Sequence, residues 1–231
     1  METIKNLRFA ATVAIMVFAF TSCDLDNYSG PDASISGEVR DIDTGDLIEQ
    51  DVSSGSTIVF TEHGYDNPEE QRMIFKVNGE YVNNLIFSGI YDFYFYESNF
   101  VIPEKLTDYQ IKSGKNTLDF KVQPYIRITD VSIKKDGDKI VAKFKVTPTV
   151  DANVREIGLF GHIDYIVGVQ YALDRKVEAV NTSFKGQTRE FTLELGDNQF
   201  KKGTEYNFRV GAIIDVPNSK YNYAPGVKLT I

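Results

Sequence analysis

The chain has 231 residues, of which 42% are hydrophobic and 25% are charged, and its formal net charge is −8. This length allows one large or two small domains at ~100 to 200 residues each. An acidic chain without a basic stripe cannot neutralise clustered phosphates, which excludes nucleic acid as a partner. Sixteen Phe and thirteen Tyr supply the apolar side chains for packed cores.

The N-terminal region predicts an export signal. Lys5 and Arg8 precede an apolar run over residues 9–20, which fits the roughly 7 to 15 apolar residues of a secretory signal peptide. The run is too short to span a bilayer, because that takes ~20 apolar residues. We therefore expect residues 1–22 to be a cleaved signal peptide.

Thr21, Ser22 and the lone Cys23 follow the apolar run. This sequence resembles a bacterial lipobox, in which the cysteine is acylated on sulfur and becomes the new N-terminus. It departs from the commonest pattern, since Phe20 and Thr21 stand where Leu and a smaller residue are usual. An ordinary secreted protein with a free thiol is the alternative. Acylation would make membrane attachment effectively permanent, so Cys23 predicts location and not catalysis, and no thiol remains for a disulfide or a thiolate metal site.

Residues 23–33 are polar and turn-forming, and they predict a tether between lipid and the first strand. Apolar residues then alternate with polar ones over residues 33–40, the pattern of a half-buried strand. The acidic segment 41–46 predicts a turn. It has carboxylates at alternate positions, but Asp46 and Val52 stand where an EF-hand needs Gly and Glu, so we expect no metal there.

The next residues predict strands at 56–61, 73–77, 80–82, 91–96 and 117–122, with a polar loop over residues 62–71. Asn78-Gly79 between two strand-like runs favours a type I′ hairpin. In the 91–96 strand, Tyr94 and Tyr96 share the outward face with Asp92. Gln123-Pro124 is the best candidate for a domain boundary.

The second half repeats this all-β pattern. Asp136-Gly137 predicts a hairpin turn into a strand over 139–146. Further strands are expected at 157–160, 165–171, 189–195, 206–213 and 227–231. Short strands with turn signals every ~8 to 12 residues are typical of sandwiches. We therefore expect two tandem antiparallel β-sandwiches, over residues 34–123 and 124–231.

Two short motif sets resemble known domains. The segment 37–45, Gly-Glu-Val-Arg-Asp-Ile-Asp-Thr-Gly, together with Asn78-Gly79 and the Ser-Gly-Ile-Tyr of 88–91, resembles the carboxypeptidase-regulatory-like or transthyretin-like sandwich. Residues 205–212 resemble a fibronectin type III or immunoglobulin-like strand. That second resemblance implies that Tyr206 is a tyrosine-corner residue, whose hydroxyl ties the strand to upstream backbone.

The lipobox, the Asp-Asn-Tyr-x-x-Pro-Asp-Ala of 26–33 and the two domains together resemble a domain-of-unknown-function family of Bacteroidetes outer-membrane lipoproteins. Members are encoded near starch-utilisation-type transporters. The resemblance implies an accessory role in polysaccharide import at the cell surface, with the membrane, a polysaccharide, an outer-membrane transporter and partner lipoproteins as partners. The alternative it leaves open is an adaptor that docks on the transporter complex without binding glycan.

The search for catalytic motifs is mostly empty. His63 and His162 are far apart, and no nucleophile elbow, phosphate loop or dinucleotide fingerprint is present. We therefore expect no enzyme, no cofactor and no metal. Tyrosine suits sugar binding because it is apolar over its face and polar at its tip, and the candidates for one glycan-binding surface are Tyr65, Tyr94, Tyr96, Tyr221 and Tyr223.

Overall fold

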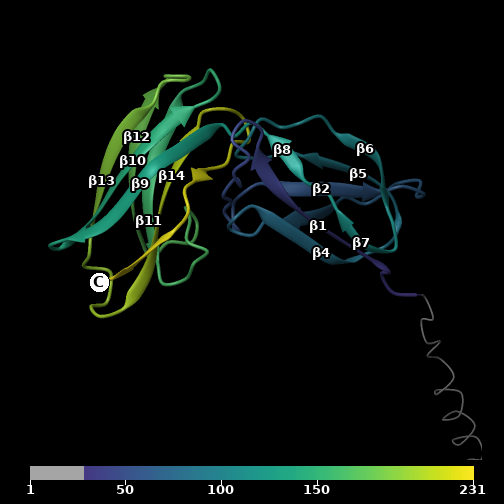
Figure 1. Cartoon of the computed structure of the whole chain (residues 1–231), viewed down its shortest axis with the longest axis horizontal. Coiled ribbons are helices and arrows are strands. Elements are labelled where there is room, and N and C mark those ends of the chain that lie inside the picture. The colour runs from purple at the N-terminus through teal and green to yellow at the C-terminus, as the bar shows by residue number, and fades with distance from the viewer. Residues whose placement is uncertain (1–28) are drawn as a thin grey trace, which may run out of the picture. The chain divides into compact units, whose positions relative to one another are not determined.

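The computed structural model describes residues 29–231, and residues 31–231 form one compact unit. Over the described range the chain folds into sixteen strands and no helix (Figure 1). The predicted all-β class is confirmed. The predicted signal peptide and Cys23 lie outside the described residues. Within the described part of the chain, no helix is long and apolar enough to cross a membrane.

The first sandwich contains two four-stranded sheets. One has the order β4-β1-β7, with β8 also paired to β1, and the other has the order β3-β2-β5-β6. Their bounds are β1 Ala33–Asp41, β2 Thr57–Glu62, β3 Gln71–Ile74, β4 Glu80–Ile86, β5 Gly89–Phe95, β6 Leu106–Ile111, β7 Gly114–Thr117 and β8 Phe120–Val122. The sequence led us to expect antiparallel pairing throughout, but β1 pairs in parallel with β7 and β8.

Aromatic side chains fill the first core. In β5 the expected alternation is present, because Tyr91, Phe93 and Phe95 are buried while the side chains between them face outward. Gly37 in β1 allows the closest approach: a Cβ there would lie 1.9 Å from the Leu118 carbonyl oxygen. Ring pairs packed edge-to-face or offset stabilise the core beyond the effect of the area they bury. The first sandwich therefore has a rigid frame for its surface residues.

The segment 73–82 does not form the predicted hairpin. β3 pairs with β2 and β4 pairs with β1, so the two strands belong to different sheets. Gly79 has a positive φ of 84° and its amide donates to the Lys76 carbonyl, so the local chain reversal is real. Asn78 is not among the residues with positive φ, whereas a type I′ turn requires positive φ at both central positions.

The second sandwich contains a sheet of order β13-β10-β9 and a sheet of order β12-β11-β14-β15, with β16 also on β14. Asp136 pairs with Lys139 across the turn between β9 and β10, which confirms the hairpin predicted there. The bounds are β9 Ile126–Asp136, β10 Lys139–Pro148, β11 Val154–His162, β12 Asp174–Thr182, β13 Arg189–Gly196, β14 Glu205–Ile214, β15 Asn222–Tyr223 and β16 Val227–Thr230.

Two features of the second sandwich concern the sequence predictions. The backbone amide of Lys201 donates to the Tyr206 hydroxyl at 3.0 Å, which confirms the expected upstream tie. The predicted strand over 165–171 is wrong: those residues form an irregular loop between β11 and β12. In β14, seven consecutive residues from Phe208 to Ile214 are buried. One face of β14 packs in the sandwich core and the other is covered by different parts of the chain.

Candidate functional site

A buried arginine lies where the two sandwiches meet. Arg209, on β14, is 0% exposed. Its Nη2 is 2.6 Å from a Glu49 carboxylate oxygen, its Nη1 donates to the Gln50 carbonyl at 2.8 Å, and its Nε donates to the Ala224 carbonyl at 2.8 Å. The guanidinium also stacks 4.3 Å from the centre of the Tyr223 ring. Burial raises the pKa of the Glu49 carboxyl, and the attraction of Arg209 opposes that rise.

Tyr221 and Tyr223 line the same seam and are only 5% and 6% exposed. The Tyr221 hydroxyl donates to Glu156 at 2.6 Å, and the Tyr223 hydroxyl donates to Asp51 at 3.0 Å. Our expectation that these two tyrosines are exposed sugar platforms is wrong. The cause is the short strand β15, which pairs with β14 and turns both rings onto Phe160.

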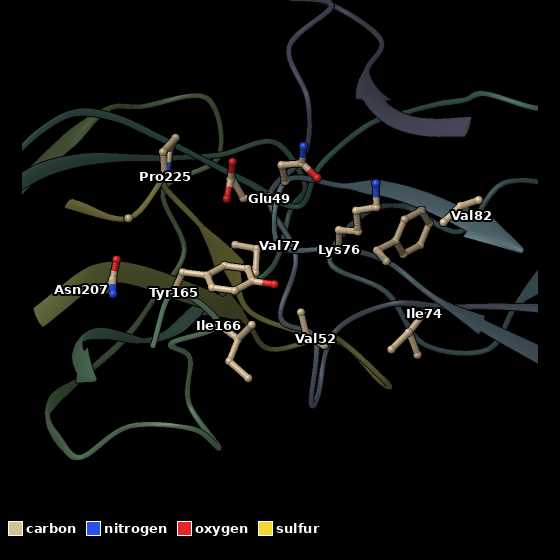
Figure 2. A pocket seen from close by; sticks show the side chains of 13 residues that line it. Glu49, Val52, Ile74, Lys76, Val77, Val82, Tyr165, Ile166, Asn207 and Pro225 are labelled. Atoms are coloured by element: carbon tan, nitrogen blue, oxygen red, sulfur yellow. The ribbon is translucent and has the colours of Figure 1, made fainter. Parts of the chain in front are cut away.

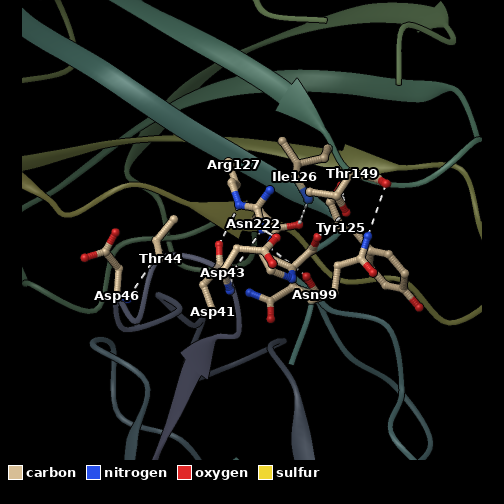
Figure 3. A network of polar contacts seen from close by, with 12 residues as sticks. Asp41, Asp43, Thr44, Asp46, Asn99, Tyr125, Ile126, Arg127, Thr149 and Asn222 are labelled. Carbon is tan, nitrogen blue, oxygen red and sulfur yellow. Dashed lines mark hydrogen bonds and ion pairs between the residues drawn. The ribbon is translucent and has the colours of Figure 1, made fainter. Parts of the chain in front are cut away.

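Polar side chains form a second set of ties across the seam (Figure 3). Across the seam, Asn222 donates to the Asn99 carbonyl at 2.7 Å, and within the second sandwich it accepts the Ile126 amide at 3.1 Å. Arg127 binds both oxygens of Asp41 and, at 2.6 Å, a carboxylate oxygen of Asp43. These contacts and the buried arginine hold the two sandwiches in one arrangement.

The acidic segment 41–46 forms the predicted turn. The Asp43 amide donates to the Asp41 side chain at 2.9 Å, and Gly45 has a positive φ of 77°. Burial opposes ionisation of Asp41, but the hydrogen bonds from Arg127 and from backbone amides outweigh it and lower its pKa. Within residues 29–231, no group of three or more His, Cys, Asp and Glu side chains lies close enough together to hold a metal ion.

An open groove lies beside Arg209 at the seam (Figure 2). Its volume is about 640 Å³, within the ~300 to 1,000 Å³ range of small-molecule sites. Both sandwiches contribute to its walls, and Glu49 joins the groove to the buried ion pair. The lining residues are Glu49, Val52, Ile74, Phe75, Lys76, Val77, Asn78 and Val82 from the first sandwich, and Tyr165, Ile166, Asn207, Pro225 and Gly226 from the second.

Tyr165 is the aromatic side chain most open to solvent in this groove. It is 66% exposed, and Figure 2 shows its ring extending from the second sandwich toward Val77 of the first. Asn207 donates to the Ile163 carbonyl at 3.0 Å and so anchors the loop that carries Tyr165. The groove therefore offers a flat ring and aliphatic walls together with amide, ammonium and carboxylate groups.

Two of the predicted tyrosines, Tyr94 and Tyr96, lie together on the outer side of the β3-β2-β5-β6 sheet, and a third, Tyr65, lies in the loop between β2 and β3. The hydroxyls of Tyr94 and Tyr96 both donate to one oxygen of Glu70, at 2.7 and 2.6 Å. Tyr96 is 47% exposed, whereas the ammonium of Lys105 lies 5.0 Å from the centre of the Tyr94 ring. Tyr65, in the loop that also carries Glu70, is 65% exposed.

The tyrosine surface, meaning Tyr94 and Tyr96 with Glu70, is bordered by a charged cluster. Asp92 binds Lys105 at 2.7 Å and His63 at 2.8 Å. Burial opposes ionisation of Asp92, but Lys105, the Asp108 amide and His63 together lower its pKa to about 2. The five predicted tyrosines are thus divided among this surface, the β2–β3 loop that carries Tyr65 and the buried seam, and they do not form one surface.

Sequence reasoning missed Tyr165 as a candidate. The sequence predicts a strand over 165–171, in which Tyr165 is one more half-buried aromatic residue. The usable signal is its position in Ile-Asp-Tyr-Ile-Val-Gly, shortly after the apolar run 157–160 and before a glycine. Such a position suits a loop tip, where binding residues are often found.

Comparison with known proteins identifies the family. Residues 33–123 match the DUF3823 N-terminal domain, a protein of unknown function, and residues 126–228 match the domain of unknown function DUF3823_C. The chain belongs to the DUF3823 family. This confirms the expected membership of a domain-of-unknown-function family. A search of curated proteins finds no match to this DUF3823 chain.

Solved structures of similar proteins support the assignment. A protein from Bacteroides uniformis, described as a "putative carbohydrate binding protein", is 34% identical with a TM-score of 0.79, and the match covers 87% of this chain and 100% of that one. A DUF3823 family protein from Parabacteroides merdae is 18% identical with a TM-score of 0.73 over 87% and 100% of the two chains. The second likeness shows the DUF3823 fold alone.

Proposed function

We propose that this chain is a lipid-anchored carbohydrate-binding protein without catalytic activity, and that the groove at the seam receives the glycan. The observation that carries the proposal is the exposed Tyr165 ring in a groove whose walls are partly aliphatic and partly hydrogen-bonding. Sugar rings present apolar C–H faces and a rim of hydroxyls, so they need both kinds of wall. The description of the 34% identical Bacteroides protein supports the same ligand class.

The seam makes this groove a preformed site. Arg209 ties β14 to residues 49 and 50 of the first sandwich, and Glu49 both neutralises Arg209 and lines the groove. Because the walls are already fixed, little conformational entropy is lost when a ligand binds. This favours the groove over the tyrosine surface, where the hydroxyls of Tyr94 and Tyr96 are both engaged with Glu70.

The location of the protein is part of the proposal. Acylation of Cys23 would attach the chain to the outer membrane, and the family resemblance implies the cell surface, beside a transporter and its partner lipoproteins. There the protein would act as an accessory glycan binder for import. An adaptor that docks on that complex without binding sugar is the rival reading, and the binding experiment separates the two.

The test is affinity electrophoresis of the soluble chain from Asp24 onward in native gels loaded with plant, host and microbial polysaccharides. We expect one glycan class to retard the protein. Tyr165→Ala should greatly reduce the retardation, whereas Tyr65→Ala is the matched control, because the two rings are 66% and 65% exposed. Loss of retardation with Tyr65→Ala alone would move the site to the β2–β3 loop, and uniform migration across the panel would favour the adaptor.

A further inference from the structure

The described chain enters the fold at the end of the first sandwich opposite to the seam. Ala33, the first residue of β1, pairs with Ile86 and Gly114. Asp32 accepts the Ser88 amide at 2.7 Å and the Ser88 hydroxyl at 2.9 Å. The entry point therefore lies between the β4–β5 turn and the β6–β7 turn, and Figure 1 shows the purple start of the chain beside β7.

Three large apolar side chains are exposed at this end. Leu85, Phe87 and Ile90 are 77%, 45% and 41% exposed, and all lie in or beside the β4–β5 turn. Leu85 has the largest exposed fraction among the large hydrophobic residues of the described chain. We call these three residues the entry patch. Leu85 faces outward from one sheet and Ile90 from the other, so the entry patch surrounds the tip at which β4 turns into β5. An exposed apolar tip of this kind is a candidate for contact with a protein or a membrane.

Charged side chains of both signs surround the entry patch. Lys112 and Lys115 are exposed on the β6–β7 side and make no ion pair with any described residue. Asp32 and Glu62 lie at the same end, with Asp32 bound to Ser88 and Glu62 beside Gly89, and the β2–β3 loop that begins there adds Asp66 and Glu69. A zwitterionic phospholipid surface carries no net charge, so it would not repel this end.

The short chain between Cys23 and the fold limits the distance between an acylated Cys23 and the entry patch. Cys23 and Pro31 are eight residues apart, so the chain between them spans at most about 29 Å. β1 then runs its nine residues from the entry end to the seam, about 30 Å at the rise of a strand. An acylated Cys23 would keep the entry end near the bilayer and would place the groove about one strand length farther away.

We propose that the entry patch rests on the lipid bilayer when the chain is anchored through Cys23. The proposal rests on the anchored state given under the proposed function. Three side chains are too few to hold a protein on a membrane, but a short tether raises the effective concentration of the patch at the surface. The contact orients the first sandwich so that the groove opens above the membrane.

The test uses chemical coupling in place of biological acylation. The chain from Cys23 to Ile231 is coupled through its single cysteine to a maleimide lipid in phosphatidylcholine vesicles. The sequence contains no tryptophan, so Phe87→Trp provides a unique fluorophore in the patch. We expect a blue shift of its emission on coupling and strong quenching by brominated phosphatidylcholine. Leu173→Trp, at a residue of the second sandwich that is 49% exposed, is the control and should show neither.

Leu85→Trp gives a second probe in case the first substitution disturbs folding. If both patch tryptophans keep a water-like emission and escape quenching while the chain is coupled, the bilayer contact is refuted. Because coupling is chemical, this result does not depend on acylation in the cell. The proposed anchor is tested separately, and it is refuted if Cys23→Ala leaves the protein in the membrane fraction.

Discussion

Removing either partner of the seam ion pair should destabilise the whole described unit. Arg209 has no exposed surface, and the Glu49 side chain is 14% exposed, so a lone charge in either place would be buried without its neutralising partner. Breaking such a pair costs roughly 3 to 5 kcal/mol. Arg209→Ala would also leave the Gln50 and Ala224 carbonyls without their donors, so it should lie at the upper end of that range.

The measurement is thermal and chemical unfolding of Glu49→Gln, Arg209→Ala and the double variant. For a chain of this size, ~1 kcal/mol corresponds to roughly 2 to 4 °C, so each single change should lower the melting temperature by roughly 6 to 20 °C. The two effects should not add, because both remove one interaction. Lys139→Ala, which breaks the exposed pair with Glu194, is the control and should change the melting temperature little. A loss of under ~1 kcal/mol for Arg209→Ala would refute the reasoning.

Three further predictions concern the fold, its pH dependence and the anchor. Gly37→Ala should lower the free energy of unfolding by about 1 to 3 kcal/mol or more, because its Cβ would meet the Leu118 carbonyl at 1.9 Å. Gly30→Ala, with open space around it, should leave the free energy measured in denaturant titrations unchanged. The pKa of Asp92 is lowered from 3.8 to about 2, so its stabilising contribution is complete above pH 3.8 and is lost as the pH falls from 3.8 to about 2. Asp92→Asn should flatten the pH dependence of unfolding in that window, and an unchanged slope would contradict the assignment. Cys23→Ala should release a folded protein from the membrane fraction, as followed by cell fractionation.

Local patterns in the sequence were sufficient for the strands and for some turns. The alternation of Tyr91, Phe93 and Phe95 identified the buried face of β5, because burial on one face of a strand leaves a period of two in the sequence. The Asp136-Gly137 turn could also be predicted from local sequence, because the two strands that it joins are adjacent in both sequence and space. Asn78-Gly79 carried a similar signal, but a turn motif cannot specify which sheet each flanking strand joins.

The site residues depend on contacts between segments far apart in the chain. Arg209 alternates with Phe208 and Val210 in β14, so the pattern alone predicts a solvent-facing side chain. It is buried because residues 49 and 50 of the other sandwich cover that face. Tyr223 is covered in the same way, since its hydroxyl meets Asp51. No local sequence signal reports contacts of this kind.

The most direct test of the account is retardation of the soluble chain by polysaccharide, compared among the parent, Tyr165→Ala and Tyr65→Ala. The account predicts that one glycan class slows the parent and Tyr65→Ala. It also predicts that Tyr165→Ala binds at least about tenfold more weakly, since a central aromatic anchor contributes ~2 kcal/mol or more. Equal retardation of all three proteins would contradict the groove as the binding site, and no retardation of the parent by any glycan would contradict the carbohydrate-binding function itself.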